Sequence, residues 1–254
     1  MSQEQMAMPA TALVLAGGFG TRLRQVLPHM PKVLAPVAGR PFLDYVLTYL
    51  ANQGILRVVL CTGYLAEQVE VFAGEGRRWN LEVSYSRETV PLGTAGALKQ
   101  ASRSQEGSFI ALNGDTLFLA DLKALWEAHR INHMLATVAL LPVPDGRGRG
   151  CVTVDKRVTT GNYRKILSFD EKPGQPQPAL INAGVYVLEP EALAGVLPDQ
   201  PVSIERQVFP RLAAAGKLGG AIQSAYFTDI GTPESLADFE KDLANDAIPD
   251  LNMV

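Results

Sequence analysis

Cysteine is scarce in this chain of 254 residues, which contains only Cys61 and Cys151. Two cysteines in apolar or strand-like contexts argue against a disulfide framework and against a metal site, so we expect two buried thiols. No apolar run approaches the roughly 20 residues that cross a membrane. The first ten residues also lack the basic and apolar segments of a secretory signal. These absences predict a cytoplasmic protein without a membrane partner.

Positive charge is not in excess either. The chain has 23 Lys and Arg against 26 Asp and Glu, a net charge of −3, so a surface for nucleic acid is not expected. Histidine is limited to three residues, of which His129 and His133 are four apart in a helical pattern. Arg130 stands where a zinc-protease motif requires Glu after the first histidine. We therefore interpret this pair as a solvated helix end, not as a metal site.

Strand-like and helical patterns are, in contrast, plentiful, and hydrophobic residues make up 47% of the chain. Their alternation predicts an α/β fold with a Rossmann-like mixed, mostly parallel sheet flanked by helices. No boundary between two cores is evident, so we expect one domain over residues 1–254. The expected strands are 11–15, 57–61, 81–86, 109–112, 136–141, 181–188 and 221–227, with a small antiparallel extension of 151–155 and 165–171. The expected helices are 42–53, 65–72, 93–101, 121–129, one that starts at Ser203 and one that starts at Thr232.

The most informative stretch, residues 13–41, reads LVLAGGFGTRLRQVLPHMPKVLAPVAGRP. Its apolar start breaks at Gly17 and Gly18 and leads to two cations, Arg22 and Lys32. Glycine lets backbone N–H groups approach an anion closely, and successive N–H groups form an anion-binding concavity. Arg suits forked contacts to phosphate oxygens, and Lys acts as a point charge. The stretch therefore predicts a phosphate-binding loop.

Two common phosphate loops do not fit it. The pattern G-x-x-x-x-G-K-[ST] fails because Arg22 occupies the second glycine position, and G-x-G-x-x-G fails because Leu23 occupies the third. The stretch instead resembles the signature of the sugar-1-phosphate nucleotidyltransferases. In that family GGxGTRL is followed by a spacer, by PK and by P-x-x-x-x-P, which here are residues 17–23, 31–32 and 36–41.

Two aspartates follow predicted strands. Asp115 comes just after 109–112, and Asp229 lies in the sequence FTDIGTP. Ligands of open α/β sheets bind outside the carboxyl ends of strands, where carboxylates can hold Mg²⁺. Each Asp alone is explained equally well as a turn former, but together with a phosphate loop they favour a metal site. The resemblance implies that both coordinate one Mg²⁺ that bridges the nucleotide.

The sequence PLGTAGAL, residues 91–98, is a second glycine-rich turn. It predicts a helix N-terminus with bare backbone that can lie against a ring, although tight packing of helix on strand would use the same residues. The resemblance implies that Gly93 and Thr94 contact the nucleobase. The nucleotide-binding residues that it implies in all are Leu15, Ala16, Gly17, Gly18, Gly20, Thr21, Arg22, Gly93, Thr94 and Asn113.

The sequence FDEKP, residues 169–173, places an acid beside a base at a strand end. Neighbours in a strand point to opposite faces, so Glu171 and Lys172 reach one ligand only if the strand breaks, as Pro173 suggests. A solvated edge pair is the alternative. The resemblance assigns Glu171 to the sugar hydroxyls and Lys172 to the sugar phosphate. It also places Asn182, which can donate and accept, and Gly184, which allows close approach, at the floor of the sugar pocket.

The resemblance extends from Leu13 to about Phe239 and implies the nucleotide-diphospho-sugar transferase fold. Residues 1–140 would bind mainly the nucleoside triphosphate, and residues 141–254 mainly the sugar 1-phosphate. The sugar phosphate would attack the α-phosphorus and release pyrophosphate, with Mg²⁺ as cofactor and Arg22, Lys32 and Lys172 as catalytic cations. No hexapeptide repeat follows, so a β-helix tail is not expected. The sequence does not fix the oligomeric state, and a homo-oligomer is possible.

The substrates depend on finer features. The spacer 24–30 lacks the R-P-x-T segment common in thymidylyl- and uridylyltransferases. The runs KVLAPVAGRPFLDY and ALNGDTLF resemble guanylyltransferases that act on manno-configured heptose 1-phosphates. GTP with D-glycero-D-manno-heptose 1-phosphate is therefore the first expectation. GTP with mannose 1-phosphate is second, and UTP or dTTP with a hexose 1-phosphate is third. A non-catalytic regulatory subunit of the same fold is an alternative that the retained charged residues disfavour.

Overall fold

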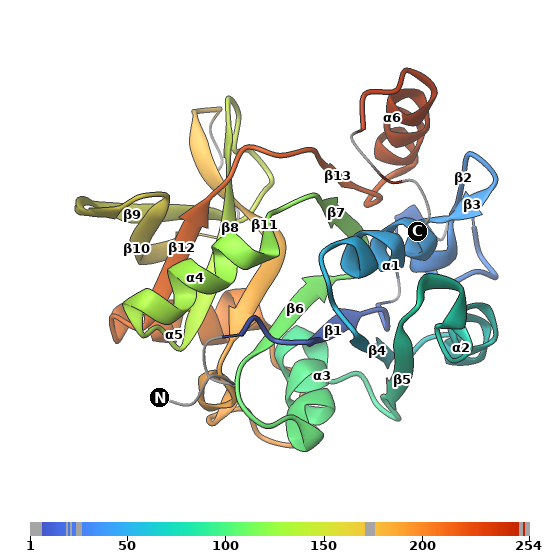
Figure 1. Cartoon of the computed structure of the whole chain (residues 1–254), viewed down its shortest axis with the longest axis horizontal. Coiled ribbons are helices and arrows are strands. Elements are labelled where there is room, and N and C mark those ends of the chain that lie inside the picture. Colours follow the sequence, from blue (N-terminus) through green and yellow to red (C-terminus); the bar gives the residue numbers. More distant parts are fainter. Residues whose placement is uncertain are drawn as a thin grey trace.

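The computed structural model of the protein describes residues 7–18, 20, 22–23, 27–170, 176–248 and 251. A nine-stranded sheet, in the order β5-β4-β1-β6-β11-β8-β12-β10-β9, runs through its centre (Figure 1). The strands are β1 (Thr11–Leu15), β4 (Arg57–Thr62), β5 (Glu82–Arg87), β6 (Phe109–Asn113), β8 (Ala136–Val143), β9 (Cys151–Thr160), β10 (Tyr163–Asp170), β11 (Ala179–Leu188) and β12 (Leu218–Ile222). Since only β10 and β11 run against the other strands, the prediction of a mixed, mostly parallel sheet is confirmed.

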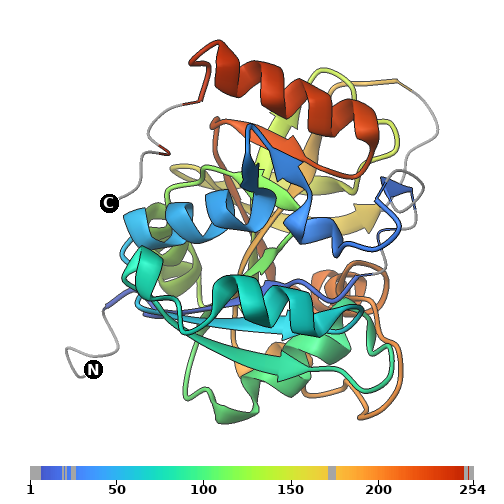
Figure 2. The same cartoon turned by 90° about the vertical axis from the view of Figure 1, so that its right-hand side faces the viewer.

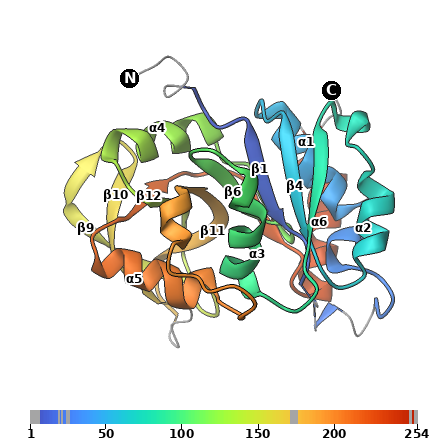
Figure 3. The ribbon, with the colours of Figure 1, turned by 90° about the horizontal axis from the view of Figure 1, so that it is seen from below.

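Helices cover both faces of the sheet because alternate residues of each buried strand point to opposite sides. On β1, Ala12 and Val14 belong to one apolar cluster, and Leu13 belongs to the other. The first cluster packs under α1 (Phe42–Asn52), α2 (Ala66–Ala73), α4 (Leu122–Asn132) and α6 (Pro233–Ala244), and the second under α3 (Gly93–Ala101) and α5 (Phe209–Ala214). Figure 3 shows α4 and α5 on opposite sides of the sheet.

Two short ribbons stand outside the main sheet. β2 (Pro36–Val37) pairs with β3 (Arg40–Pro41), and β7 (Thr116–Phe118) pairs with β13 (Phe227–Asp229). Both are too short to produce a periodic pattern, and only β13 was part of an expected strand. Helix α6 contacts both ribbons and lies across them in Figure 2. These ribbons border the site described below.

The single strand expected at 221–227 is wrong. The chain instead forms β12, which pairs with β8, then leaves the sheet and forms β13, which pairs with β7. Gln223 holds the chain at the point where it leaves the sheet. Its side-chain oxygen accepts from the Asp121 amide at 2.7 Å, and its side-chain nitrogen donates to the Asp121 carbonyl at 3.0 Å. The division matters because it carries Asp229 away from the main sheet to β7.

The helix expected from Ser203 begins as a wider turn. Residues Ile204–Val208 form one π-helical turn before α5, and the Phe209 amide donates to the Ile204 carbonyl five residues back. Pro210 has no amide to continue an α-helical ladder at this point, which favours the wider turn ahead of it. Ser203 caps the turn by accepting from the Arg206 amide at 3.2 Å.

The interpretation of His129 as solvated is also wrong. Its side chain is 2% exposed, because it follows Leu122 and Leu125 on the apolar face of α4. Nδ1 lies 2.9 Å from Thr137 Oγ1, and Nε2 lies 3.0 Å from Glu189 Oε1. His133, at the end of the same helix, is exposed as expected.

Both cysteines are buried thiols, as expected. Among the described residues, no helix combines the length and the apolar character needed to cross a bilayer.

Candidate active site

A cavity of about 650 Å³ opens where β1, β4, β5 and β6 end. These four strands are parallel, so their carboxyl ends meet at one edge of the sheet. Leu15, at the end of β1, pairs with Cys61 of β4 and with Asn113 of β6. Of the residues predicted to bind nucleotide, those that line the cavity are Leu15, Ala16, Gly17, Gly18, Gly93, Thr94 and Asn113.

The glycines after β1 allow three segments to converge on this cavity. A Cβ atom on Gly17 would lie 3.1 Å from the Gly63 nitrogen, and one on Gly63 would lie 3.1 Å from the Gly17 oxygen. Gly20 has φ +54°, and a Cβ atom there would lie 2.9 Å from Cβ of Lys32. The predicted glycine loop therefore packs against the loop after β4 on one side and against the stem of Lys32 on the other. Gly63 is part of this site and was not predicted.

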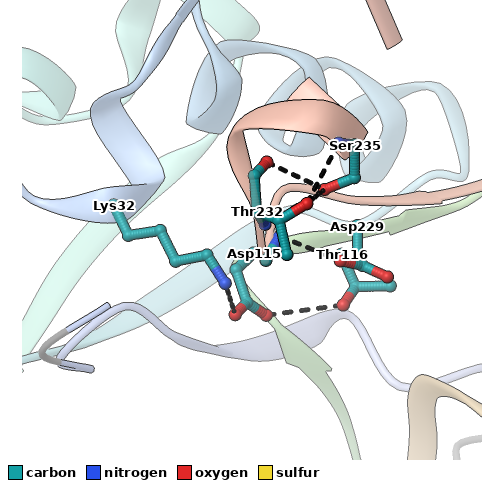
Figure 4. A network of polar contacts seen from close by, with 7 residues as sticks. Lys32, Asp115, Thr116, Asp229, Thr232 and Ser235 are labelled. Carbon is teal, nitrogen blue, oxygen red and sulfur yellow. Dashed lines mark hydrogen bonds and ion pairs between the residues drawn. The ribbon is translucent and has the colours of Figure 1, made fainter. Parts of the chain in front are cut away.

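Lys32 and Asp115 form an ion pair on the cavity wall, with 2.6 Å between Nζ and Oδ2 (Figure 4). Lys32 begins a 3₁₀ turn, Lys32–Leu34, whose Val33 and Leu34 are buried, so its base is anchored. Asp115 lies just beyond β6, where the Gly114 amide donates to the Leu15 carbonyl at 2.9 Å. The Lys32 side chain is only 14% exposed, whereas the Asp115 side chain is 39% exposed and accessible to a ligand.

The β7–β13 ribbon brings the second predicted aspartate to the first. Asp229 pairs with Thr116, and the Ile230 amide donates to the Asp115 carbonyl at 3.0 Å. Asp229 Oδ1 accepts from the Gly231 amide at 2.8 Å. A Cβ atom on Gly231 would lie 2.7 Å from Asp229 Oδ1 and 3.9 Å from Nη2 of Arg22, which places the guanidinium beside this turn. Arg22, Asp115 and Asp229 thus lie on one side of the site.

The two carboxylates fit a divalent cation. Mg²⁺ binds through one or two carboxylates and completes its shell with water and substrate phosphates. Asp115 and Asp229 supply such a pair, in which Asp115 Oδ1 accepts from the Thr116 hydroxyl and Asp229 Oδ1 accepts from the Gly231 amide. Cations compete for the same oxygens, since Lys32 now occupies Asp115 Oδ2. Among the described residues there is no cluster of three or more His, Cys, Asp or Glu that could form a closed protein cage for a metal.

The turn at the start of α3 is docked on the segment before α5. The Thr94 hydroxyl donates to Glu205 Oε2 at 2.9 Å and accepts from the Ile204 amide at 2.8 Å. Gly93 has φ +69°, and a Cβ atom there would lie 2.6 Å from the Val202 oxygen. Gly93 and Thr94 line the cavity, but the only hydroxyl proton of Thr94 is engaged by Glu205. The backbone of this turn and the Thr94 methyl group are what remain for a ligand.

Glu88 is a cavity residue that the sequence analysis missed. It follows β5, its amide donates to the Thr62 carbonyl at 2.8 Å, and its Oε2 accepts from the Leu92 amide at 2.9 Å. Burial raises the pKa of the Glu88 carboxyl, against the opposing effect of the Leu92 hydrogen bond. An acidic residue two positions after a predicted strand and three before PLGT was the available signal. Arg87 and Glu67, which form an ion pair, also line the cavity.

Asn182 and Gly184 form an irregular turn of β11 next to the cavity. The β11–β8 register shifts between Asn182 and Tyr186, and Asn182 stabilises the shift by accepting from the Gly184 amide and donating to the Tyr186 hydroxyl, both at 2.9 Å. Gly184 has φ +75°, and a Cβ atom there would lie 3.1 Å from Nδ2 of Asn113. Oδ1 of Asn113 is buried without a partner among the described residues, so a donor from a bound molecule would satisfy it.

Several predicted residues lie outside the described part of the chain. Thr21 of the glycine loop, residues 24–26 of the spacer, and both Glu171 and Lys172 belong to this group. Gly20, Arg22, Asn182, Gly184 and Asp229 are described and lie near the cavity, but they do not line it.

Comparisons with known proteins agree with this geometry. A family model described as nucleotidyl transferase matches residues 11–246. The chain is 38% identical over 234 residues to D-glycero-alpha-D-manno-heptose 1-phosphate guanylyltransferase of Aneurinibacillus thermoaerophilus, covering 91% of this chain and 97% of that one. It is 37% identical over 241 residues to mannose-1-phosphate guanylyltransferase of Mycobacterium tuberculosis, covering 94% of this chain but only 66% of the relative's length.

Solved structures give the same result. The crystal structure of HddC from Yersinia pseudotuberculosis superposes with a TM-score of 0.80 at 29% identity, covering 92% of this chain and 99% of that one. A second structure of HddC, complexed with GMP-PN, superposes with a TM-score of 0.79 over the same shares.

Proposed function

Because the chain belongs to the nucleotidyl transferase family, we propose that it transfers GMP from GTP to a sugar 1-phosphate and releases pyrophosphate. The first candidate for the acceptor is D-glycero-D-manno-heptose 1-phosphate. The observation that carries this reaction is the contact of Lys32 with Asp115 on the wall of a cavity that the glycine loop also lines. A nucleoside triphosphate needs a cation and a metal-binding carboxylate at one place, beside backbone that can approach its phosphates.

The reaction needs no protein nucleophile. An oxygen of the acceptor phosphate forms a bond to the α-phosphorus, and the bond from that phosphorus to the pyrophosphate breaks. The work of the protein is to position two anions and to stabilise the charge that develops between them. We assign Lys32 to the α-phosphate, Arg22 to the leaving pyrophosphate and Lys172, outside the described residues, to the acceptor. Residues 1–140 then bind mainly the donor and residues 141–254 mainly the acceptor.

Asp115 and Asp229 would hold a divalent cation, with Mg²⁺ as the first candidate. When bound, the cation supplies charge neutralisation for the triphosphate. The protein's own part is to hold both carboxylates in place. The Gly231 amide does this for Asp229, and the ammonium of Lys32 does it for Asp115.

Glu88 supports guanine as the base. Guanine presents two neighbouring donors on its pairing edge, N1–H and the 2-amino group, and an ionised carboxylate only accepts. Uracil and thymine place a single donor between two carbonyl oxygens, which a carboxylate would repel. One oxygen of Glu88 is held by the Leu92 amide, so the carboxylate is fixed in orientation before a base arrives.

The heptose acceptor is supported by the share of each relative's length that this chain covers. The chain spans 97% of the length of the heptose 1-phosphate enzyme but 66% of the mannose 1-phosphate enzyme. Mannose 1-phosphate therefore stands second, and UTP or dTTP with a hexose 1-phosphate third. A non-catalytic subunit is disfavoured because Lys32, Asp115 and Asp229 are all retained in place.

A matrix of pyrophosphate release tests this proposal. GTP, ATP, UTP and dTTP are each combined with heptose, mannose and glucose 1-phosphates, with and without Mg²⁺. We expect release with GTP and a manno-configured acceptor, dependent on the metal. Release only with UTP or dTTP would overturn the guanine assignment, and no release in any combination would favour the non-catalytic subunit.

A further inference from the structure

The loop between β8 and β9, residues 144–150, connects the two sides of the proposed acceptor site. At one end the Gly150 carbonyl accepts from the Asn182 amide at 2.7 Å. At the other side the guanidinium of Arg149 lies over the ring of Phe227, 5.3 Å from its centroid. Phe227 lies two residues before Asp229 on β13. The loop therefore reaches from the sugar-floor residue Asn182 to the strand that carries a proposed metal ligand.

Arg149 is on the same side of β13 as that ligand. Residues two apart in a strand project from one face, so Phe227 and Asp229 share a face of the β7–β13 ribbon, and Arg149 covers the Phe227 end of it. A guanidinium stacked on an aromatic ring keeps its edge N–H groups available for a phosphate. On the proposed reaction, the acceptor phosphate must lie between the sugar floor and the two aspartates. The loop that carries Arg149 extends over this region, from Asn182 to Phe227.

The loop is held in shape before any ligand binds. The Arg149 amide donates to the Gly146 carbonyl at 3.2 Å, and the Gly146 amide donates to the Gln177 carbonyl at 3.0 Å. The Cys151 thiol also lies 3.3 Å from the Gly146 carbonyl. A preorganised loop loses little conformational entropy on binding, which favours a role in recognition.

A second arginine in the same loop, Arg147, is paired with a carboxylate of the loop itself. Arg147 donates to Asp145 through its amide at 3.0 Å, through Nε at 2.8 Å and through Nη2 at 2.6 Å. Both carboxylate oxygens of Asp145 are therefore occupied by Arg147. The charge of Arg147 is satisfied within the loop, whereas the guanidinium of Arg149 lies over the ring of Phe227.

We propose that Arg149 binds the acceptor and donates to its phosphate, an inference that rests on the proposed function. The acceptor is an anion that must approach Asp115 and Asp229, and their carboxylates repel it. A cation on the acceptor side offsets this repulsion, and the forked donors of Arg match phosphate oxygens. Lys32 and Arg22 lie on the donor side and serve the triphosphate.

Steady-state kinetics with the acceptor varied at saturating GTP and Mg²⁺ test the assignment. Loss of a charge-assisted hydrogen bond should raise the acceptor KM of Arg149→Ala about 10- to 100-fold. The KM for GTP should change less than about twofold, because Arg149 does not touch the donor. Arg149→Lys keeps the charge without the fork and should show a smaller rise. Arg147→Ala is the matched control and should retain the wild-type acceptor KM.

The outcomes separate this inference from the function on which it rests. An unchanged acceptor KM in Arg149→Ala, or a rise in the KM for GTP instead, would overturn the role of Arg149 while leaving the reaction intact. Calorimetric titration of the sugar 1-phosphate gives a reading that needs no turnover, and equal affinity for wild type and Arg149→Ala would also overturn it. Arg149 is exposed, so the variant should keep the wild-type melting temperature. A wild-type protein that releases no pyrophosphate contradicts the proposed function itself.

Discussion

On the proposed donor side of the cavity, four parallel strands end at one edge of the sheet and present the glycine loop, Gly63, Glu88 and Asn113 together. On the acceptor side, β11 runs against its neighbours and presents Asn182 and Gly184 from within the strand, at a shift in register. Parallel topology gathers strand ends without special contacts, whereas the acceptor side depends on a few side-chain hydrogen bonds. The donor side should therefore tolerate substitution in its framework better than the acceptor side.

The largest effect should come from the ion pair where the two sides meet. Replacing Lys32 by Ala removes the cation that we assign to the α-phosphate, and replacing Asp115 by Asn removes the charge of a proposed metal ligand. We expect either change to lower kcat on the order of a hundredfold or more, because both act on the charge that develops in the transition state. Pyrophosphate release at saturating substrates and Mg²⁺ measures it.

Lys241→Ala is the control for Lys32→Ala. Lys241 forms an ion pair with Asp238 at 3.0 Å on the exposed face of α6, and its loss should leave kcat unchanged. Turnover near the wild-type rate in Lys32→Ala or Asp115→Asn would contradict their proposed roles.

A smaller effect, confined to the donor side, should come from Glu88→Gln. The amide presents a donor to a guanine edge that itself donates, so kcat/KM for GTP should fall about 10- to 100-fold, the equivalent of about 1–3 kcal/mol for a mismatched hydrogen bond. The values for UTP should not fall in parallel. Glu67→Gln, an exposed carboxylate on the same cavity, is the control. An equal loss with GTP and UTP would mean that Glu88 does not read the base.

Much of the donor side was predictable from the sequence because its residues stand next to strand ends. Gly17 and Asp115 come soon after a short apolar run, which places them on the cavity, whereas Lys32 and Gly93 are marked by the PK and PLGT motifs. Glu88 stands in the same kind of position and was missed, because it belongs to none of the motifs that identified the other residues. Local pattern and parallel topology together determine this half of the site.

The acceptor side was less predictable because its geometry depends on long-range contacts. The strand expected at 221–227 is broken by bonds between Gln223 and Asp121, 102 positions apart in the chain. That break is what brings Asp229 to Asp115. His129 likewise has polar partners, Thr137 and Glu189, that no local pattern reveals.

Gly184→Ala tests whether the acceptor side is as sensitive as its construction implies. The added methyl group would lie 3.1 Å from Asn113 Nδ2 at a φ of +75°. Strain and crowding together should destabilise the protein by about 1–3 kcal/mol and raise the acceptor KM more than the KM for GTP. Thermal unfolding and steady-state kinetics measure the two effects.

Gly161→Ala is the matched control for that substitution. Gly161 also has a positive φ, +58°, but a Cβ atom there has no neighbour within 4 Å. Gly161→Ala should be destabilised by the strain of a left-handed backbone conformation, and neither the acceptor KM nor the KM for GTP should change. Equal effects of the two substitutions would mean that the contact of Gly184 with Asn113 is unimportant.

The smallest effect concerns the other end of β11, where Glu189 contacts His129 and Ser108. Burial raises the pKa of the Glu189 carboxyl, but the hydrogen bonds from His129 and Ser108 and the charge of His129 outweigh it and leave the pKa below its ordinary value. A lowered carboxyl pKa stabilises the fold above the pKa of the unfolded chain, about 4.3, and this contribution is lost as pH falls through the folded value.

We therefore expect wild type to melt about 2–4 °C above Glu189→Gln near pH 6, a shift that corresponds to about 1 kcal/mol for a protein of this size. The difference should shrink as pH falls below about 5. Melting curves of both proteins between about pH 6 and about pH 4 measure it, and the exposed Glu191→Gln should show no such trend. Both KM values should stay unchanged, because Glu189 lies at the opposite edge of the sheet from the cavity. A change in the acceptor KM alone would show that the acceptor side depends on the whole length of β11 and not only on its irregular turn.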